Sequence, residues 1–370
     1  MRGTSTFRNQ LRVVALVAGA LVLAACGGGG STSSSSAASS SGAGSSLIDS
    51  ARCERNRAAG TITYISGYGY SASAGQLDVF VAKQLGYFDQ LCLKVEINAS
   101  GANGQQLVAA NQAQFTSLGS ASDVMLSAAN SKNLKAIATY GTQPPFAIFA
   151  NEKIKSLKDL EGGTLGYFIN LTPIASAMLE AAGVDVSKVK LVKMTNYDPT
   201  VVPRGQVDAI VGYASNQVQT LRAMNLPFTE FLPEQFGVNG TYNVAEVNTQ
   251  FLEKNRAVAA DFMRAGMKAA ELCLADEAQC VDIVAKLAAE NNQGAAFPEE
   301  QLARTWKVES QWVRDSAGGD PGVQTAAMWQ PEYELVQKYT DAKLPPLADM
   351  MDNELVAGLY QDGKLQWPGQ

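Results

Sequence analysis

Hydrophobic and polar positions follow two different periods along most of the chain. Short apolar or alternating runs indicate strands, whereas apolar residues spaced three and four apart indicate amphipathic helices. Between residues 61 and 150 the pattern predicts strands at 61–66, 93–98, 115–118, 134–140 and 146–150, and helices at 76–85, 104–111 and 122–130. This alternation predicts an α/β fold in which helices cover an open sheet.

A second unit with the same alternation begins near residue 164. Strands are predicted at 164–168, 189–194 and 209–211, and a helix at 172–182 begins with Thr172 as N-cap and Pro173 at its first position. The pair Asp198-Pro199 repeats this start signal before another helix. Segments 228–232 and 242–247 are predicted to be strands that return to the first unit. From Thr249 onward the pattern predicts mostly helix.

The first 50 residues follow neither period. Arg2, Arg8 and Arg12 form a basic n-region that overlaps the start of the apolar run 11–25. This run is too short to span a bilayer, which is typical of a secretory signal peptide. The sequence at 23–26, Leu-Ala-Ala-Cys, resembles the bacterial lipobox, where the peptide is cut before the cysteine and the cysteine is acylated. We therefore expect residues 1–25 to be removed and Cys26 to carry a lipid that anchors an extracytoplasmic protein to the cell membrane. An ordinary signal peptide with a chance cysteine is the alternative.

Residues 26–50 are predicted to be a flexible tether, because 27–46 contains only Gly, Ser, Ala and Thr and cannot bury a core. No later segment has 18 consecutive apolar residues, so the sequence predicts no second membrane anchor. About 320 residues remain, which is enough for two lobes or one large domain.

The charge of the chain excludes some partners. Without residues 1–25 the chain has 26 Lys and Arg against 35 Asp and Glu, a net charge of −9. This acidic balance argues against nucleic acid as a partner and against adsorption to anionic lipid through a basic patch. Membrane attachment is therefore expected to depend on the lipid at Cys26.

Four cysteines remain after Cys26, and an even number in an exported protein predicts two disulfides. The local spacing favours Cys273 with Cys280 and, by elimination, Cys53 with Cys92; four buried free thiols are the alternative. The chain has no histidine and no CxxC pair, so zinc is not expected, and we expect no metal or other cofactor.

Six loops follow predicted strands, where open α/β sheets bind their ligands. The loops 67–73, 100–104, 119–122, 168–172, 195–198 and 212–216 are rich in Tyr, Asn, Ser and Gly and contain no Lys or Arg. Aromatic rings can stack on a planar ligand, and amides and hydroxyls can orient it. The loops therefore favour a neutral or weakly charged, flat ligand. The alternative is that these residue types are simply common in turns.

The candidate ligand-binding residues of these loops fall into two groups. The residues expected to stack on the ligand or contact its edge are Tyr68, Tyr70, Phe168, Tyr197 and Tyr213. The residues expected to donate or accept hydrogen bonds are Ser71, Asn103, Ser120, Ser122, Asn170, Thr172 and Asn216.

Three segments resemble a known group of solute-binding proteins. Residues 76–88 are similar to the segment "lyvAkekGyF", residues 156–167 to "s.kDLkGk.vG", and residues 205–209 to "l.sGkvDA". These motifs belong to the thiamine-pyrimidine-synthase-like and nitrate–sulfonate–riboflavin-binding group, and the resemblance covers about residues 61–245. It implies a two-lobed periplasmic-binding-protein type II fold, in which each lobe is an open mixed sheet flanked by helices.

The resemblance also implies how the lobes are divided. Lobe one is expected at 53–148 plus 245–370 and lobe two at 149–244, hinged by two crossovers near 148–150 and 242–245. Hinge closure around a ligand is the usual motion of such folds. The protein is then expected to be a monomer that hands a small molecule to an ABC permease in the membrane.

Members of this group bind sulfonates, nitrate, formylaminopyrimidines or riboflavin, and the aromatic, base-free loops favour a riboflavin- or pyrimidine-like vitamin or precursor over small anions. The group also contains an enzyme, the thiamine-pyrimidine synthase, which needs a histidine, an active-site lysine and a cysteine-rich motif. This sequence has no histidine and no cysteine cluster, so we expect a binding protein rather than an enzyme.

Two other hypotheses stay open. One is an extracytoplasmic enzyme that uses Asp123 or Asp198 as a base, although both residues also suit a helix start. The other is a surface sensor or interaction protein built on the same lobes.

Overall fold

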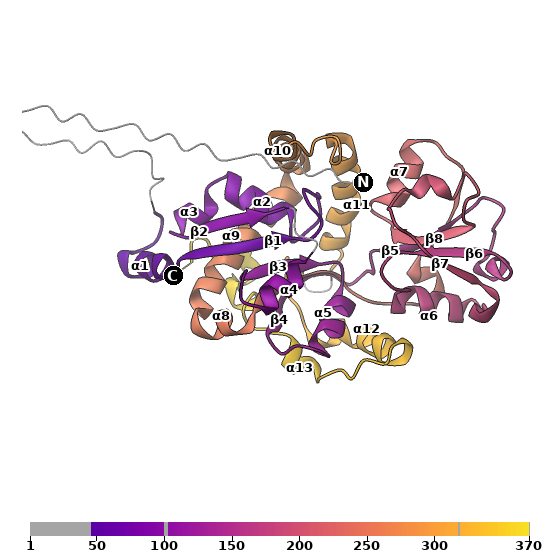
Figure 1. Ribbon diagram of the computed structural model, residues 1–370. Coiled ribbons are helices and arrows are strands. Elements are labelled where there is room, and N and C mark those ends of the chain that lie inside the picture. The colour runs from indigo at the N-terminus through magenta and orange to yellow at the C-terminus, as the bar shows by residue number, and fades with distance from the viewer. Residues whose placement is uncertain (1–45, 100–102, 317–318, 370) are drawn as a thin grey trace, which may run out of the picture. The chain divides into compact units, whose positions relative to one another are not determined.

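The computed structural model describes residues 46–99, 103–316 and 319–369, which belong to one compact unit, Ala43–Gln370. The expectations for residues 1–45, including the signal peptide and Cys26, lie outside the described residues. The described chain is an α/β protein with two five-stranded mixed sheets flanked by helices (Figure 1). None of its described helices combines the length and the apolar composition needed to cross a membrane.

The first sheet has the order β2-β1-β3-β10-β4. Strands β1, β2 and β3 are parallel, whereas β10 runs antiparallel to both β3 and β4. The carboxyl ends of the three parallel strands therefore lie at one edge of the sheet, together with the start of β10. The strands are β1 (Thr61–Ser66), β2 (Lys94–Asn98), β3 (Phe115–Leu118), β4 (Leu134–Gly141) and β10 (Tyr242–Asn248).

Alternate residues of the first sheet pack against helices on its two faces, because successive side chains of a strand point in opposite directions. Tyr64 packs with α2 and α9, and its neighbour Ile65 packs with α4. The aromatic centre of the first face is the stack of Phe115 on Phe262, with ring centroids 4.0 Å apart. The helices around this sheet are α1 (Ser50–Ala58), α2 (Leu77–Gln84), α3 (Tyr87–Gln90), α4 (Gly104–Ala109), α5 (Ala121–Ala128), α8 (Thr249–Lys254), α9 (Arg256–Ala275), α10 (Glu277–Glu290), α11 (Glu299–Arg314), α12 (Ala326–Tyr339) and α13 (Leu347–Met350).

The second sheet has the order β7-β6-β8-β5-β9, with β6, β7 and β8 parallel and β5 antiparallel to its neighbours. Helices α6 and α7 cover opposite faces (Figure 1): Ile148 packs with α6 and Phe149 with α7. The elements are β5 (Phe146–Ala150), β6 (Thr164–Tyr167), α6 (Pro173–Ala181), β7 (Lys190–Lys193), β8 (Ala209–Tyr213), α7 (Gln217–Ala223) and β9 (Thr229–Phe231), and a short hairpin, β11 (Tyr360–Gln361) with β12 (Lys364–Leu365), lies near the C-terminus.

Most predicted elements are confirmed, and the start of α6 is the clearest case. Pro173 occupies the first turn, and the Thr172 hydroxyl accepts a hydrogen bond from the Ala175 backbone N–H at 3.1 Å. The Asp198-Pro199 signal is weaker than predicted. Asp198 caps only the 3₁₀ turn Pro199–Val201, and no α-helix follows directly.

Two strand placements in the predictions are wrong. β9 was expected to return to the first sheet but pairs with β5 in the second, and β5 itself belongs to the second sheet throughout. The chain therefore passes between the sheets at 142–145 and again at 232–241, before β10, rather than near 148–150 and 242–245. Strand patterns show which residues are extended, but pairing partners depend on contacts distant in sequence.

Both predicted disulfides are confirmed. Cys53 of α1 pairs with Cys92, which precedes β2, with Cα atoms 5.2 Å apart, and Cys273 of α9 pairs with Cys280 of α10 at 5.4 Å. The first disulfide closes 39 residues and the second only 7. Since the constraint on the unfolded chain grows with loop length, the first should contribute more to stability.

Replacing Cys53 and Cys92 together by alanine should lower the free energy of unfolding by about 4 kcal/mol, against about 2 kcal/mol for the Cys273 and Cys280 pair. Urea unfolding of the two double variants measures both values. Alkylation of the wild-type protein before and after reduction is the control for disulfide content. Equal losses in the two variants would contradict the loop-length explanation.

Two carboxyl groups are buried in the first sheet and its helix layer, and neither has a basic partner in the part of the chain that the structure describes. Glu246 of β10 receives its hydrogen bonds from the Gln105 amide, at 3.2 and 3.3 Å, and burial raises the pKa of the Glu246 carboxyl to about 8. Asp78 of α2 accepts a hydrogen bond from Tyr140 at 2.7 Å, and burial raises the pKa of Asp78 to about 6.

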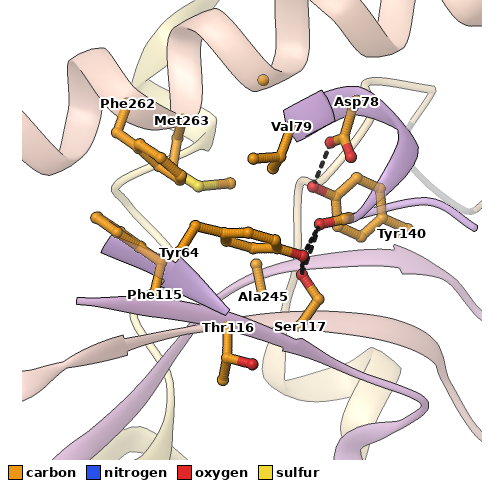
Figure 2. A pocket seen from close by; sticks show the side chains of 12 residues that line it. Tyr64, Asp78, Val79, Phe115, Thr116, Ser117, Tyr140, Ala245, Phe262 and Met263 are labelled. Carbon is orange, nitrogen blue, oxygen red and sulfur yellow. Dashed lines mark hydrogen bonds between the residues drawn. The ribbon is translucent and has the colours of Figure 1, made fainter. Parts of the chain in front are cut away.

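Asp78 also lines an internal cavity of about 10 Å³ beside Tyr64, Ser117 and Tyr140 (Figure 2). A space of this size holds one water molecule at most. It is therefore a packing defect next to buried polar groups and not a ligand pocket.

These buried carboxyls set the sign of the pH dependence of stability. Their pKa values are raised on folding, so the folded state binds protons that the unfolded state releases, and stability should fall as the pH rises from about 5 to about 8. The substitution Glu246→Gln should raise the melting temperature at pH 8 and flatten this decline. Calorimetry between pH 5 and 8.5 tests it, with Glu96→Gln on exposed β2 as the matched control. An unchanged slope in the Glu246 variant would overturn the assignment.

Candidate functional site

The loop that follows β1 meets the end of β8, although the two strands belong to different sheets. The hydroxyls of Tyr68 and Tyr213 are 3.2 Å apart, and their rings are edge-on with centroids 6.1 Å apart. Gly119, after β3, lies against both hydroxyls: a Cβ at this position would be 2.7 Å from the Tyr213 oxygen and 3.1 Å from the Tyr68 oxygen. The close approach of these tyrosines therefore requires glycine at 119.

A second aromatic pair belongs to the loops of the second sheet. Phe168, after β6, stacks on Tyr197 with ring centroids 3.9 Å apart. Tyr197 is 55% exposed, and it is close enough to Tyr68 and Tyr213 to affect the pKa of both hydroxyls, although burial is the main reason that these pKa values are raised. The four rings give this region flat apolar surface, part of it open to solvent.

Asp123, in the first turn of α5, faces the same corner. One of its carboxylate oxygens is 3.6 Å from the Cβ position of Gly119, and the carboxylate accepts backbone hydrogen bonds from Gly119 and Ser120. Burial, followed by the charge of Glu332, raises the pKa of Asp123 to about 6. The strongest charge acting on this half-buried carboxyl is thus another acid, not a lysine or arginine.

A buried carboxylate connects the two sheets. Glu309 of α11 accepts hydrogen bonds from Ser73 at 3.1 Å, from Ser215 at 2.6 Å and from the Tyr242 hydroxyl. Ser73 and Tyr242 belong to the first sheet and its loops, whereas Ser215 follows β8 of the second. Burial raises the pKa of Glu309 to about 7.

Another buried acid lies against the start of α5 but belongs to a different helix. Glu332 of α12 accepts hydrogen bonds from the Ser122 N–H and the Thr241 N–H, both at 2.8 Å, and from the hydroxyls of both residues. The Thr241 hydroxyl in turn accepts the Ala121 N–H at 2.7 Å. A helix N-terminus ordinarily attracts anions, but here protein groups already satisfy its donors.

The structure places the predicted residues in three situations. Tyr68, Phe168, Tyr197 and Tyr213 come together, and the Ser71 hydroxyl lies 3.0 Å from Ser73 and so joins the Glu309 network. Ser120 is buried at the same corner, and its hydroxyl has no hydrogen-bond partner among the described residues. Asn103, Asn170 and Asn216 are exposed, as is Tyr197.

Three other predicted residues have structural contacts instead. Tyr70 stacks on Phe80, with centroids 5.2 Å apart, and packs edge-on against Phe297 beside the helical core. The Ser122 hydroxyl is bonded to Glu332, and that of Thr172 caps α6. The composition of a loop cannot distinguish residues that pack or cap a helix from residues that contact a ligand, because the same residue types serve both purposes.

The sequence analysis missed the acids from the C-terminal helices, although a signal was present. Glu309 shares a helical stripe with Leu302, Trp306 and Val313, and Glu332 shares one with Trp329. An acid on an apolar stripe predicts burial and hence a specific partner. Within the described part of the chain, no group of three or more Cys, Asp or Glu side chains is arranged to hold a metal ion.

Comparison with known proteins agrees with this architecture. The formylaminopyrimidine-binding protein of Halalkalibacterium halodurans is 25% identical over 284 residues, which cover 73% of this chain and 83% of that protein. The aliphatic sulphonate binding protein SsuA of Escherichia coli has a TM-score of 0.58 at 14% identity, covering 78% of this chain and 91% of its own. A mutant of the enzyme DSZB in complex with biphenyl-2-sulfinic acid has a TM-score of 0.59 at 13% identity, covering 80% and 98%.

The structural matches confirm the predicted periplasmic-binding-protein type II fold. A sequence profile described as "NMT1/THI5 like" matches residues 75–279, more than half of the chain. The predicted family relationship is thereby confirmed: this chain belongs to the NMT1/THI5-like family.

Proposed function

We propose that this protein is the extracytoplasmic substrate-binding protein of an ABC importer, and that it captures a neutral or weakly charged aromatic heterocycle between two lobes. The observation that carries the proposal is the meeting of Tyr68 and Tyr213 across the two sheets, with Phe168 and Tyr197 beside them. Flat aromatic surface next to hydroxyls suits a planar ring that needs a fixed orientation.

The lobes follow from the two sheets. Lobe one contains the first sheet with its helices, lobe two contains the second, and the passages at 142–145 and 232–241 serve as the hinge. The contact from Glu309 to Ser215 joins the lobes, together with the bonds from Lys338 and Tyr339 of α12 to Glu180 of α6, and hinge motion opens the site to solvent. A lipid on Cys26 keeps this monomer near the permease that receives the ligand.

The chemistry of the site favours a heterocycle over a sulfonate or nitrate. The donors at the start of α5 are taken by Glu332 and Thr241, and the carboxylate of Asp123 at the same corner repels anions. The likeness to sulfonate-binding proteins is at 14% identity and supports the fold only. The formylaminopyrimidine-binding relative supports a pyrimidine-like ligand.

The alternative of an enzyme on the same scaffold has a named precedent in DSZB, which shares the fold. The two residues that could act as a base in such an enzyme already accept hydrogen bonds at the start of a turn and of a helix. Asp198 accepts the Thr200 N–H at 2.9 Å and the Thr200 hydroxyl, and Asp123 accepts two backbone N–H groups. Recovery of the bound molecule chemically unchanged after incubation distinguishes the binding protein from the enzyme.

A thermal-shift screen of flavins, pyrimidines, taurine and nitrate tests the ligand class. A heterocycle at 100 times its dissociation constant should stabilise the folded state by about 2.7 kcal/mol. Tyr197→Ala should weaken its binding roughly two- to tenfold, since an aromatic pair contributes about 0.5–1.5 kcal/mol beyond burial. Leu191→Ala, another exposed apolar side chain of the second sheet region, is the matched control. A shift with taurine or nitrate alone would eliminate the heterocycle and retain a binding protein.

The contact between the lobes is tested by Ser215→Ala, which removes one hydroxyl from Glu309 and leaves Ser73 and Tyr242 in place. Losing a hydrogen bond to a charged group costs about 1.5–3 kcal/mol, so the ligand-free protein should shift toward open conformations. Small-angle scattering without ligand should then give a larger radius of gyration. Ser187→Ala, a locally bonded hydroxyl in the second lobe, is the control. An unchanged radius in the Ser215 variant would show that this contact does not hold the lobes.

A further inference from the structure

One face of α11 lies against both lobes. Trp312 packs with the hydrophobic core of the first sheet and with that of the second, and its ring is edge-on to Tyr242 of β10 with centroids 5.1 Å apart. Glu309 precedes Trp312 by about one helical turn and so lies on the same face. Nearer the start of α11, the Gln301 amide donates a hydrogen bond to the Asn216 backbone oxygen, after β8, at 3.3 Å. The second lobe therefore covers the part of α11 that carries Glu309.

Glu309 is an ionisable group enclosed at this contact. It is only 2% exposed, and its carboxyl is bonded by Ser73 and Tyr242 from the first lobe and by Ser215 from the second. Tyr242 is itself titratable, but burial, followed by the charge of Glu309, raises the pKa of its hydroxyl well above the usual value, so Tyr242 stays neutral. Asp78 of α2 is a further acid that acts on this tyrosine. The charges around Glu309 are thus negative, and they favour its uncharged form.

The three hydroxyls accommodate Glu309 in either protonation state. An ionised carboxylate only accepts hydrogen bonds, and all three hydroxyls then donate to it. A protonated carboxyl must donate one hydrogen bond, and a hydroxyl can turn to accept it. A lysine or arginine in place of a hydroxyl would hold the carboxyl ionised, because neither side chain can accept a hydrogen bond.

Opening of the lobes changes the surroundings of this carboxyl. Separation removes Ser215 and admits water, so the ionised form recovers the hydration that it lacks in the closed form. In the closed form burial raises the pKa of Glu309 to about 7, whereas an exposed glutamate has a pKa of about 4.3. The form with the higher pKa holds the proton more tightly. Closure is therefore favoured as the pH falls, and opening as the pH rises.

We propose that Glu309 is a proton-binding site coupled to the hinge, which takes up a proton from water when the lobes close and returns it when they open. The proposal rests on the two-lobed arrangement of the proposed function and adds a means of regulating it. The O–H bond of the carboxyl is the bond that forms and breaks. A binding protein with this site closes over its ligand more readily in an acidic medium than in an alkaline one.

Small-angle scattering of the ligand-free protein between pH 5.5 and 8.5 tests the coupling. The equilibrium constant for opening should rise by about 10- to 30-fold over this range, so the radius of gyration should increase with pH. Glu309→Gln, which is neutral at every pH, should keep the small radius throughout. A radius that does not change with pH in the wild type, or that still increases in the Glu309 variant, overturns the proposal.

Glu180→Gln is the matched control. Glu180 of α6 also bonds across the lobes, to Lys338 and Tyr339, but it is exposed and its pKa is lowered by the hydrogen bond from Lys338. It stays ionised throughout the range, so its variant should retain the increase of the radius with pH. Loss of the pH dependence in this variant would assign the effect to the contact between α6 and α12 and overturn the role of Glu309.

Ser215→Ala keeps the test decisive if the Glu309 variant does not fold, as thermal unfolding would show. The hydroxyl bonds more strongly to a carboxylate than to a neutral acid, so its loss should enlarge the radius more at pH 8.5 than at pH 5.5. Equal enlargement at both values overturns the proposal.

The outcomes also separate this proposal from the proposed function. A heterocycle that shifts the melting temperature, together with a radius that is independent of pH, retains the binding protein and eliminates the proton site. A pH-dependent radius that Glu309→Gln abolishes, with no heterocycle bound, retains the proton site and eliminates the proposed ligand class.

Discussion

The buried carboxylate of Glu309 is the contact on which the arrangement of the loops at the candidate site depends. It belongs to neither sheet, yet it collects hydroxyls from Ser73 and Tyr242 on one side and from Ser215 on the other. A carboxylate removed from water must find donors, so its burial costs free energy unless all of these groups are in place. The same requirement brings the loop after β1 close to the end of β8, where Tyr68 meets Tyr213.

The acids near the candidate site have no basic partners among the described residues. Asp123, Glu246 and Glu309 have raised pKa values because burial disfavours their charged forms. Basic residues elsewhere are paired differently: Arg52 forms a buried ion pair with Asp261 at 2.6 Å, far along the chain from the loops. The result is a region of carboxyl groups and aromatic faces whose loops contain no Lys or Arg.

The Glu332 network shows how protein groups can occupy a helix start that would otherwise attract an anion. The fold matches a sulphonate-binding protein, and the start of α5 has the geometry that would attract an anion. Here a carboxylate of the protein itself, from α12, takes the Ser122 and Thr241 N–H groups. A side chain that arrives from a C-terminal helix therefore takes donors that an uncovered helix start would leave free.

The sequence by itself determined the elements, because their signals are local: apolar periodicity gave β1 and β3 with correct bounds, Thr172 and Pro173 gave the start of α6, and cysteine spacing gave both disulfides. It also placed Tyr68 and Tyr213 in loops at strand ends. Only the tertiary structure decided that β9 stays in the second sheet, that Tyr70 and Ser122 have structural partners, and that Glu309 joins both sheets. Those outcomes depend on contacts between residues distant in sequence and on the free energy of burying a charge. A local sequence pattern contains neither kind of information.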